Sequence, residues 1–92
     1  MKIIYRIHAV QRVFQRFIDT KDVRFAIENG ETIENYPEDT PYPSRLILGW
    51  SSQRPIHIVI AENLPDEELI VITVYEPDPD LWEADFRTRR KS

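Results

Sequence analysis

The first part of the chain carries apolar residues at helical spacing. Within residues 5–18 they recur at i, i+3, i+4 and i+7, as Val10, Val13, Phe14 and Phe17. This spacing stacks the four side chains on one side of a helix. We therefore predict a helix over residues 5–18 and expect this apolar side to be buried.

A polar stripe follows the same helix. His8, Arg12 and Arg16 recur at every fourth residue, so they line up roughly half a turn away from the apolar stripe. This stripe faces solvent or forms part of a functional site. The pattern itself does not decide between these two interpretations.

A second helix is predicted after residue 19 by its capping residues. Asp19 has the position of an N-cap and Asp22 that of N3, while Ile18 and Val23 are spaced as a hydrophobic staple. Gly30 follows the helix, where we expect a left-handed C-terminal residue. The expected buried stripe of this helix consists of Val23, Ala26 and Ile27.

Beyond residue 31 the pattern changes from helical to extended. Thr32, Ile33 and Tyr36 suggest a first strand, and a loop with three prolines ends it. Three further segments, 45–50, 56–61 and 69–75, are rich in β-branched and aromatic residues. Their short connections favour an antiparallel meander. Residues 2–5 are too few to assign on their own, although they suit an edge strand.

These elements predict an α+β fold in a single domain of residues 1–92. Two N-terminal helices pack on one face of a four-stranded, mainly antiparallel sheet, and the other face stays partly open as a place for a site. Two prolines take the chain out of the sheet after residue 76, and Trp82 and Phe86 are spaced to dock back onto the body. Residues 87–92 are expected to form a flexible tail.

Composition and charge restrict the class of protein. The chain lacks cysteine and has no long apolar run, so we expect neither disulfides nor a membrane segment, and we expect a cytoplasmic location. The net charge of −4 is unevenly distributed, because basic ends flank an acidic middle. A net negative charge therefore does not exclude binding to nucleic acid, since phosphate contacts depend on where the cations lie.

The candidate chemistry rests on histidine, tyrosine and arginine. His8 and His57 are the two histidines, with no pattern of metal ligands around them, so we expect neither a metal nor another cofactor. Histidine and tyrosine serve as general acids or bases, and arginine holds a phosphate during RNA cleavage. The second set of candidates comes from strands: His57, Thr73, Tyr75 and Arg45. Whether Arg45 shares the face of the others depends on the hairpin register.

Each candidate residue also has a purely structural interpretation. A strand histidine beside valines is commonly a hydrogen-bonded, half-buried residue, and arginines on a helix are commonly solvated or ion-paired. Tyr75 at a strand end often only packs.

The residues of both candidate sets resemble a bacterial family, the domain of unknown function 4258. The resemblance covers nearly the whole chain and rests on a histidine with arginines one turn apart, a second helix that begins with an Asp-Val pair and ends in glycine, and a strand that ends in Thr-Val-Tyr. The matching residues are His8, Arg12, Arg16, Asp22, Val23, Gly30, Thr73, Val74 and Tyr75. The family often has glycine after the second arginine, where this chain has Phe17, and this departure affects the expected turn between the helices.

The resemblance implies a fold similar to the RelE/ParE toxins and a function in a type II toxin–antitoxin pair. The expected activity is a metal-independent endoribonuclease. His8, His57 and Tyr75 would be catalytic, and Arg12, Arg16, Arg45 and Thr73 would bind RNA phosphate. The expected partners are a small antitoxin-like protein and RNA or the ribosome. The alternative is a non-catalytic protein-binding module of the same fold.

Overall fold

The computed structural model describes residues 2–91, in which two helices and five strands follow one another along the chain. Their bounds are Lys2–Tyr5 (β1), Ile7–Gln15 (α1), Thr20–Asn29 (α2), Glu31–Tyr36 (β2), Ser44–Ser51 (β3), Arg54–Asn63 (β4) and Glu68–Tyr75 (β5). The structure confirms the α+β class that the sequence predicts.

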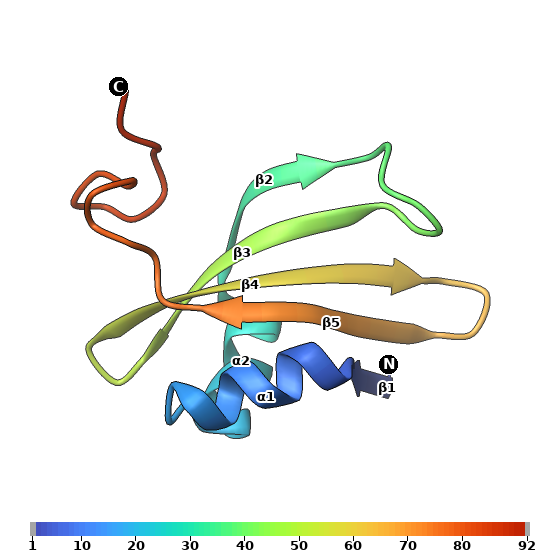
Figure 1. The fold of residues 1–92 in the computed structure, drawn as a ribbon. Coiled ribbons are helices and arrows are strands. Elements are labelled where there is room, and N and C mark those ends of the chain that lie inside the picture. Colours follow the sequence, from blue (N-terminus) through green and yellow to red (C-terminus); the bar gives the residue numbers. More distant parts are fainter. Residues whose placement is uncertain (1, 92) are drawn as a thin grey trace.

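The sheet has five strands in the order β1-β5-β4-β3-β2 (Figure 1). Strands β3, β4 and β5 form the predicted antiparallel meander, and β2 pairs antiparallel with β3. The prediction of four strands was wrong, because β1 adds a parallel edge strand on the outer side of β5. This strand has four residues and pairs with the last strand of the chain, so its own short sequence carried too little signal to assign it.

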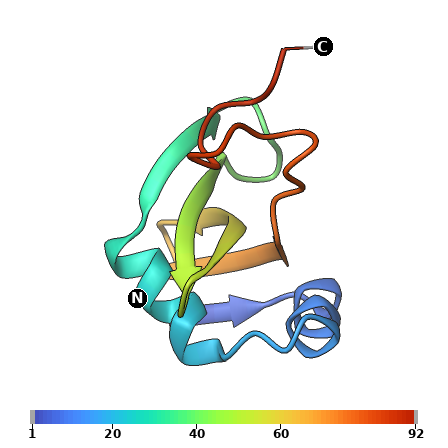
Figure 2. The same ribbon diagram turned by 90° about the vertical axis from the view of Figure 1, so that its left-hand side faces the viewer.

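Both helices lie on one face of the sheet, and the C-terminal segment, residues 77–91, lies on the other (Figures 1 and 2). Alternation along β4 sends Ile56, Ile58 and Ile60 towards the helices, where they are fully buried. His57 therefore points to the opposite face, which carries the C-terminal segment. The helix-facing core also contains Ala9, Val13, Ile18, Val23, Ala26, Ile47, Val71 and Val74.

Helix α1 does not bury the side that its sequence predicts. Ala9 and Val13 are buried, but the side chains of Phe14 and Phe17 are 76% and 89% exposed, and Val10 is exposed as well. The expectation of one buried stripe was wrong for these three residues. The reason is that apolar side chains occupy a wider arc of α1 than the sheet covers, and only part of this arc meets the core.

The turn between the helices uses Phe17 in a left-handed conformation, with φ 53°. The amide of Ile18 donates to the carbonyl of Val13 at 3.0 Å, and the amide of Phe17 donates to that of Phe14 at 3.3 Å. This pair of hydrogen bonds is the Schellman motif, whose left-handed position usually holds glycine. The turn therefore forms without the glycine that the family resemblance led us to expect.

Helix α2 has the predicted N-cap, but the Asp22 carboxylate accepts from the Ser51 hydroxyl, and the helix ends differently from the prediction. The carboxylate of Asp19 accepts a hydrogen bond from the Lys21 amide at 2.8 Å, which confirms the N-cap. Val23 and Ala26 are buried and Ile27 packs against the same core. Gly30 has an extended conformation with φ −74°, so the expected left-handed residue was wrong: the chain passes directly into β2 at Glu31.

Candidate functional site

His57 is the buried centre of the sheet face that carries the C-terminal segment. It is 0% exposed, and its Nε2 lies 2.7 Å from the carbonyl oxygen of Phe86. A carbonyl oxygen only accepts, so Nε2 carries the proton and Nδ1 accepts from the Tyr75 hydroxyl at 3.3 Å. Burial lowers the pKa of His57, and the hydrogen bond to Phe86 partly opposes this shift. The ring is therefore held in its neutral form.

Aromatic rings enclose the same imidazole. The ring of Trp82 stands perpendicular to it at 4.5 Å between centroids, and that of Tyr75 lies at 5.3 Å. Trp82 is 3% exposed, and the Arg89 guanidinium covers it at 4.7 Å from the ring centroid. Trp82 therefore docks onto the body, as its sequence position suggests, but no helix forms among residues 77–91.

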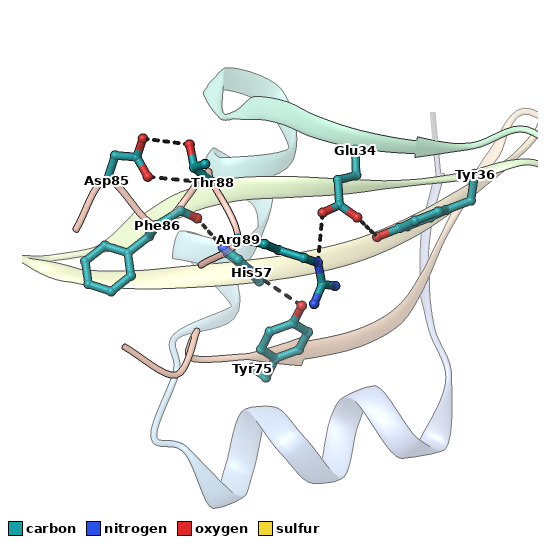
Figure 3. Close-up of polar contacts among 8 residues, drawn as sticks. All are labelled: Glu34, Tyr36, His57, Tyr75, Asp85, Phe86, Thr88 and Arg89. Atoms are coloured by element: carbon teal, nitrogen blue, oxygen red, sulfur yellow. Dashed lines mark hydrogen bonds and ion pairs between the residues drawn. The ribbon is translucent and has the colours of Figure 1, made fainter. Parts of the chain in front are cut away.

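Glu34 connects β2 to this cluster (Figure 3). Its carboxylate accepts from the Tyr36 hydroxyl at 2.7 Å and from Arg89 Nε at 3.3 Å. Burial, together with the hydrogen bond to Glu34, raises the pKa of Tyr36 to about 12. Burial also raises the pKa of Tyr75. We call Glu34, Tyr36, His57, Tyr75 and Arg89 the strand-face cluster.

Asp85 shapes the loop that presents the Phe86 carbonyl to His57. Its carboxylate accepts from the amides of Arg87 and Thr88 and from the Thr88 hydroxyl, at 3.0 to 3.1 Å. These bonds, that from the Arg87 amide first, lower the pKa of Asp85. Arg87, Arg89 and Arg90 form ion pairs with Glu31, Glu34 and Glu83. These three arginines belong to residues 87–92, the segment expected to be a flexible tail, and their ion pairs hold it against the body and against Glu83.

The candidates predicted on the first helix lie on α1 and at its C-terminal end. Arg12 Nε donates to His8 Nε2 at 3.5 Å, and both side chains project from the flank of the helix away from Val10 and Phe14. Arg16 follows at the last turn and is exposed. Within residues 2–91, no carboxylate forms an ion pair with Arg12 or Arg16. We call His8, Arg12 and Arg16 the helix-flank cluster.

The structure brings together only part of the candidates predicted from sequence. His57 and Tyr75 are paired partners on β4 and β5, and Thr73 shares their face because it lies opposite Val59. Arg45 lies opposite Ile60, so it belongs to the other face, and it is ion-paired with Glu62. Among the described residues, no side-chain hydrogen bond or ion pair joins the helix-flank cluster to the strand-face cluster.

Glu34, Tyr36 and Arg89 were not among the residues predicted for the site, and Trp82 was predicted only to dock onto the body. Glu34 and Tyr36 are two residues apart in a strand, which places both on one face, and this spacing was the available signal. Arg89 is 55 residues beyond Glu34, and no local sequence pattern predicts a contact between them.

A family model matches residues 5–76, and its description is a domain of unknown function, DUF4258. The chain belongs to the DUF4258 family. This match confirms the resemblance derived from the helix and strand motifs, and it ends at Glu76, before the segment that encloses His57. No curated protein and no solved structure matches the chain.

Within residues 2–91, no three His, Cys, Asp or Glu side chains lie close enough together to hold a metal ion. None of the helices in this range is long and apolar enough to cross a membrane.

Proposed function

We propose that this DUF4258 protein is a toxin-like, metal-independent endoribonuclease whose reacting groups belong to the helix-flank cluster. The observation that carries the proposal is the contact between Arg12 and His8 at 3.5 Å on an exposed helix flank. The absence of carboxylate partners for Arg12 and Arg16 within residues 2–91 supports it, because their charge stays available for phosphate. The same His/Arg spacing carries the family resemblance.

The chemistry needs one base and one anion clamp. His8 accepts the proton of an RNA 2′-hydroxyl while that oxygen attacks the adjacent phosphorus. The bond from phosphorus to the 5′-oxygen breaks, a 2′,3′-cyclic phosphate forms, and the departing 5′-oxygen takes a proton from water or from a protonated His8. Arg12 and Arg16 stabilise the charge that grows on the phosphoryl oxygens.

The Arg12–His8 contact is weak enough for Arg12 to leave His8 and bind a phosphate instead. A distance of 3.5 Å is at the long limit for a hydrogen bond, so the contact is weak. A phosphate oxygen binds a guanidinium much more strongly, because that hydrogen bond is charge-assisted. Arrival of RNA would therefore draw Arg12 to the phosphate and free His8 Nε2 to act as the base.

In this proposal, the other predicted site residues have different roles. Both ring nitrogens of His57 are occupied, one by the Tyr75 hydroxyl and one by the Phe86 carbonyl. His57 and Tyr75 therefore position the C-terminal segment. Thr73 lies on the same sheet face as this pair and has no part in the reaction. Arg45 is committed to Glu62 and does not hold RNA.

Induced expression tests the proposal, with growth and total RNA integrity as readouts for wild type, His8→Ala and Arg12→Ala. Wild type is expected to arrest growth and cleave RNA, and both variants are expected to lose at least about 100-fold in cleavage rate with purified protein. Arg6→Ala removes the same charge near the start of the helix but outside the cluster, and it is expected to cleave normally. Circular dichroism verifies that each variant folds. Intact RNA with soluble wild-type protein would overturn the proposal.

A second candidate function is a non-catalytic protein-binding module. The specific observation in its favour is that His57, the histidine that lies beside a tyrosine, is enclosed by Trp82 and the C-terminal segment. This candidate predicts intact RNA together with tight binding of a protein partner. In either case we propose a small antitoxin-like protein as the partner. RNA or the ribosome is the proposed target of the endoribonuclease alone.

A further inference from the structure

The surface formed by α1 and the turn after it exposes large apolar side chains. Phe14 and Phe17 are 76% and 89% exposed, and Val10 is 39% exposed. These residues line a concave groove of about 420 Å³, together with Tyr5, Val13, Ile18 and Thr20. An exposed apolar groove of this kind is typical of an interaction site.

Phe17 is the residue of this groove with the clearest conformational cost. It adopts φ 53°, a region in which a side chain costs roughly 1–2 kcal/mol relative to the right-handed form. Glycine would remove this cost, and the exposed phenyl ring gives back no core packing. Glycine at this position would therefore give a more stable fold than phenylalanine does. The presence of the aromatic side chain points to a role at the surface.

Basic side chains border the groove. Lys21 and Arg24 line a hollow that adjoins the groove and shares Tyr5 and Thr20 with it. Within residues 2–91 neither cation has an ion-pair partner.

Three acids are close in sequence to these cations, and one of them lines the hollow. Asp19 accepts from the Lys21 amide and Asp22 from the Ser51 hydroxyl, at 2.8 and 2.7 Å, which leaves Glu28 as the acid that lines the hollow. The side chains that line the hollow therefore carry two positive charges, on Lys21 and Arg24, and one negative charge, on Glu28.

We propose that this groove docks an acidic amphipathic helix of a partner protein. Leucine or isoleucine side chains on one helix face would fill the groove at Val10, Phe14 and Phe17, and aspartate or glutamate beside them would meet Lys21 and Arg24. This is the helix-in-groove mode of recognition, in which apolar anchors give affinity and charges give orientation.

Two other occupants fit less well. A second copy of the chain, docked through the same face, would bring Lys21 and Arg24 of both copies together, and like charges oppose that association. Helices that bind a membrane surface are rich in lysine and arginine on their polar face, whereas here two cations border the apolar groove.

The inference deepens the proposed function, on which it rests for the existence of a protein partner. Its test contains no RNA, so failure of the docking site and failure of the nuclease are separate results.

The test measures binding of synthetic helical peptides to the full-length protein. The probe has leucine at i, i+3, i+4 and i+7 with glutamate on both flanks, and two controls replace every glutamate by lysine or scramble the order. Fluorescence anisotropy is expected to show saturable binding of the acidic peptide only, weakened by salt. Backbone amide shifts should change at Val10, Phe14, Phe17, Lys21 and Arg24.

Substitution of Phe17 gives the sharpest variant. Phe17→Gly is expected to unfold at an equal or higher urea concentration than wild type, yet to bind the acidic peptide at least about tenfold more weakly. Loss of binding then cannot result from unfolding. Leu64→Ser is the matched control, because Leu64 is an exposed apolar residue outside the groove, and its affinity should equal that of wild type.

Charge reversal tests the basic border. Arg24→Glu is expected to weaken acidic-peptide binding at least about fivefold and to reduce its salt dependence, while Lys91→Glu makes the same charge change outside the groove and should have little effect. Equal binding of acidic and lysine peptides, or unchanged binding by Phe17→Gly, would overturn the proposal. So would binding of phosphatidylglycerol vesicles without peptide binding, or dimerisation that Phe17→Gly abolishes.

Discussion

The imidazole of His57 donates a hydrogen bond of 2.7 Å to the carbonyl oxygen of Phe86. It thereby joins strand β4 to the C-terminal segment, which lies beyond the part of the chain that the DUF4258 model matches. The contact explains how a histidine becomes fully buried on a sheet face that no helix covers. The backbone of the segment and the ring of Trp82 take the place of a helix.

This contact predicts a stability that decreases in mild acid. Burial lowers the pKa of His57 below its usual 6.5 in the folded state. As the pH falls below about 6.5, the unfolded chain takes up a proton that the folded chain refuses, so folding loses free energy until the folded pKa is reached. Urea unfolding at pH 7.5 and 5.5, followed by tryptophan fluorescence, measures the loss. His57→Gln should show a smaller difference between these two pH values, and an equal difference would contradict the assignment.

Tyr36 predicts the opposite dependence at high pH. Its pKa is raised to about 12 by burial and by the hydrogen bond to Glu34. Above pH 10 the unfolded chain loses a proton that the folded chain keeps, so stability should fall as the pH rises from about 10 to 12. The phenolate absorbance should show a component that titrates near 12 and is missing in Tyr36→Phe. In Glu34→Gln this component should move to lower pH, and no movement would contradict a role for Glu34.

Much of the fold was predictable because its signals are local. The Asp19 cap and the meander of β3 to β5 follow from residues close in sequence. The buried side of α1 was predicted correctly at Val13 and wrongly at Val10 and Phe14, because Ala9 and Val13 form one apolar stripe and Val10 and Phe14 another. Only the position of the sheet decides which stripe is covered.

The candidate site was predictable to the same extent. His57 and Tyr75 lie opposite each other because β4 and β5 form one hairpin, and His8 meets Arg12 because they are one turn apart. The link from Glu34 to Arg89 depends on the path of the whole C-terminal segment. Sequence spacing gives no register for such an irregular segment.

Gly49 predicts a steric limit between β3 and α2. A Cβ atom at Gly49 would overlap the Ala26 side chain and lie 3.2 Å from the Ala26 Cα. The φ of Gly49 is not positive, so the backbone conformation does not require glycine. The close approach of Ala26 does. We expect Gly49→Ala to destabilise the protein by about 1–3 kcal/mol, as overpacking of a core does. Urea denaturation of the double-mutant cycle with Ala26→Gly should show that the two changes are less than additive, and strict additivity would contradict the contact.

Arg54 predicts a capping contribution that connects the C-terminal end of α1 to the sheet. Its guanidinium donates to the carbonyl oxygens of Arg16 and Phe17 at 2.8 and 3.0 Å and pairs with Glu76 at 3.0 Å. These carbonyls end α1 and lack helical partners, so Arg54→Met should cost about 1–2 kcal/mol of folding free energy after allowance for its partial exposure.

Glu76→Gln is the matched control for Arg54, because it removes the ion pair and keeps both carbonyl contacts. It should cost less than about 1 kcal/mol in urea denaturation, as surface ion pairs do. Arg54→Met should also accelerate amide exchange at Phe17 and Ile18, where the turn opens first. If Glu76→Gln were as destabilising as Arg54→Met, the ion pair and not the helix cap would be the source of the stability.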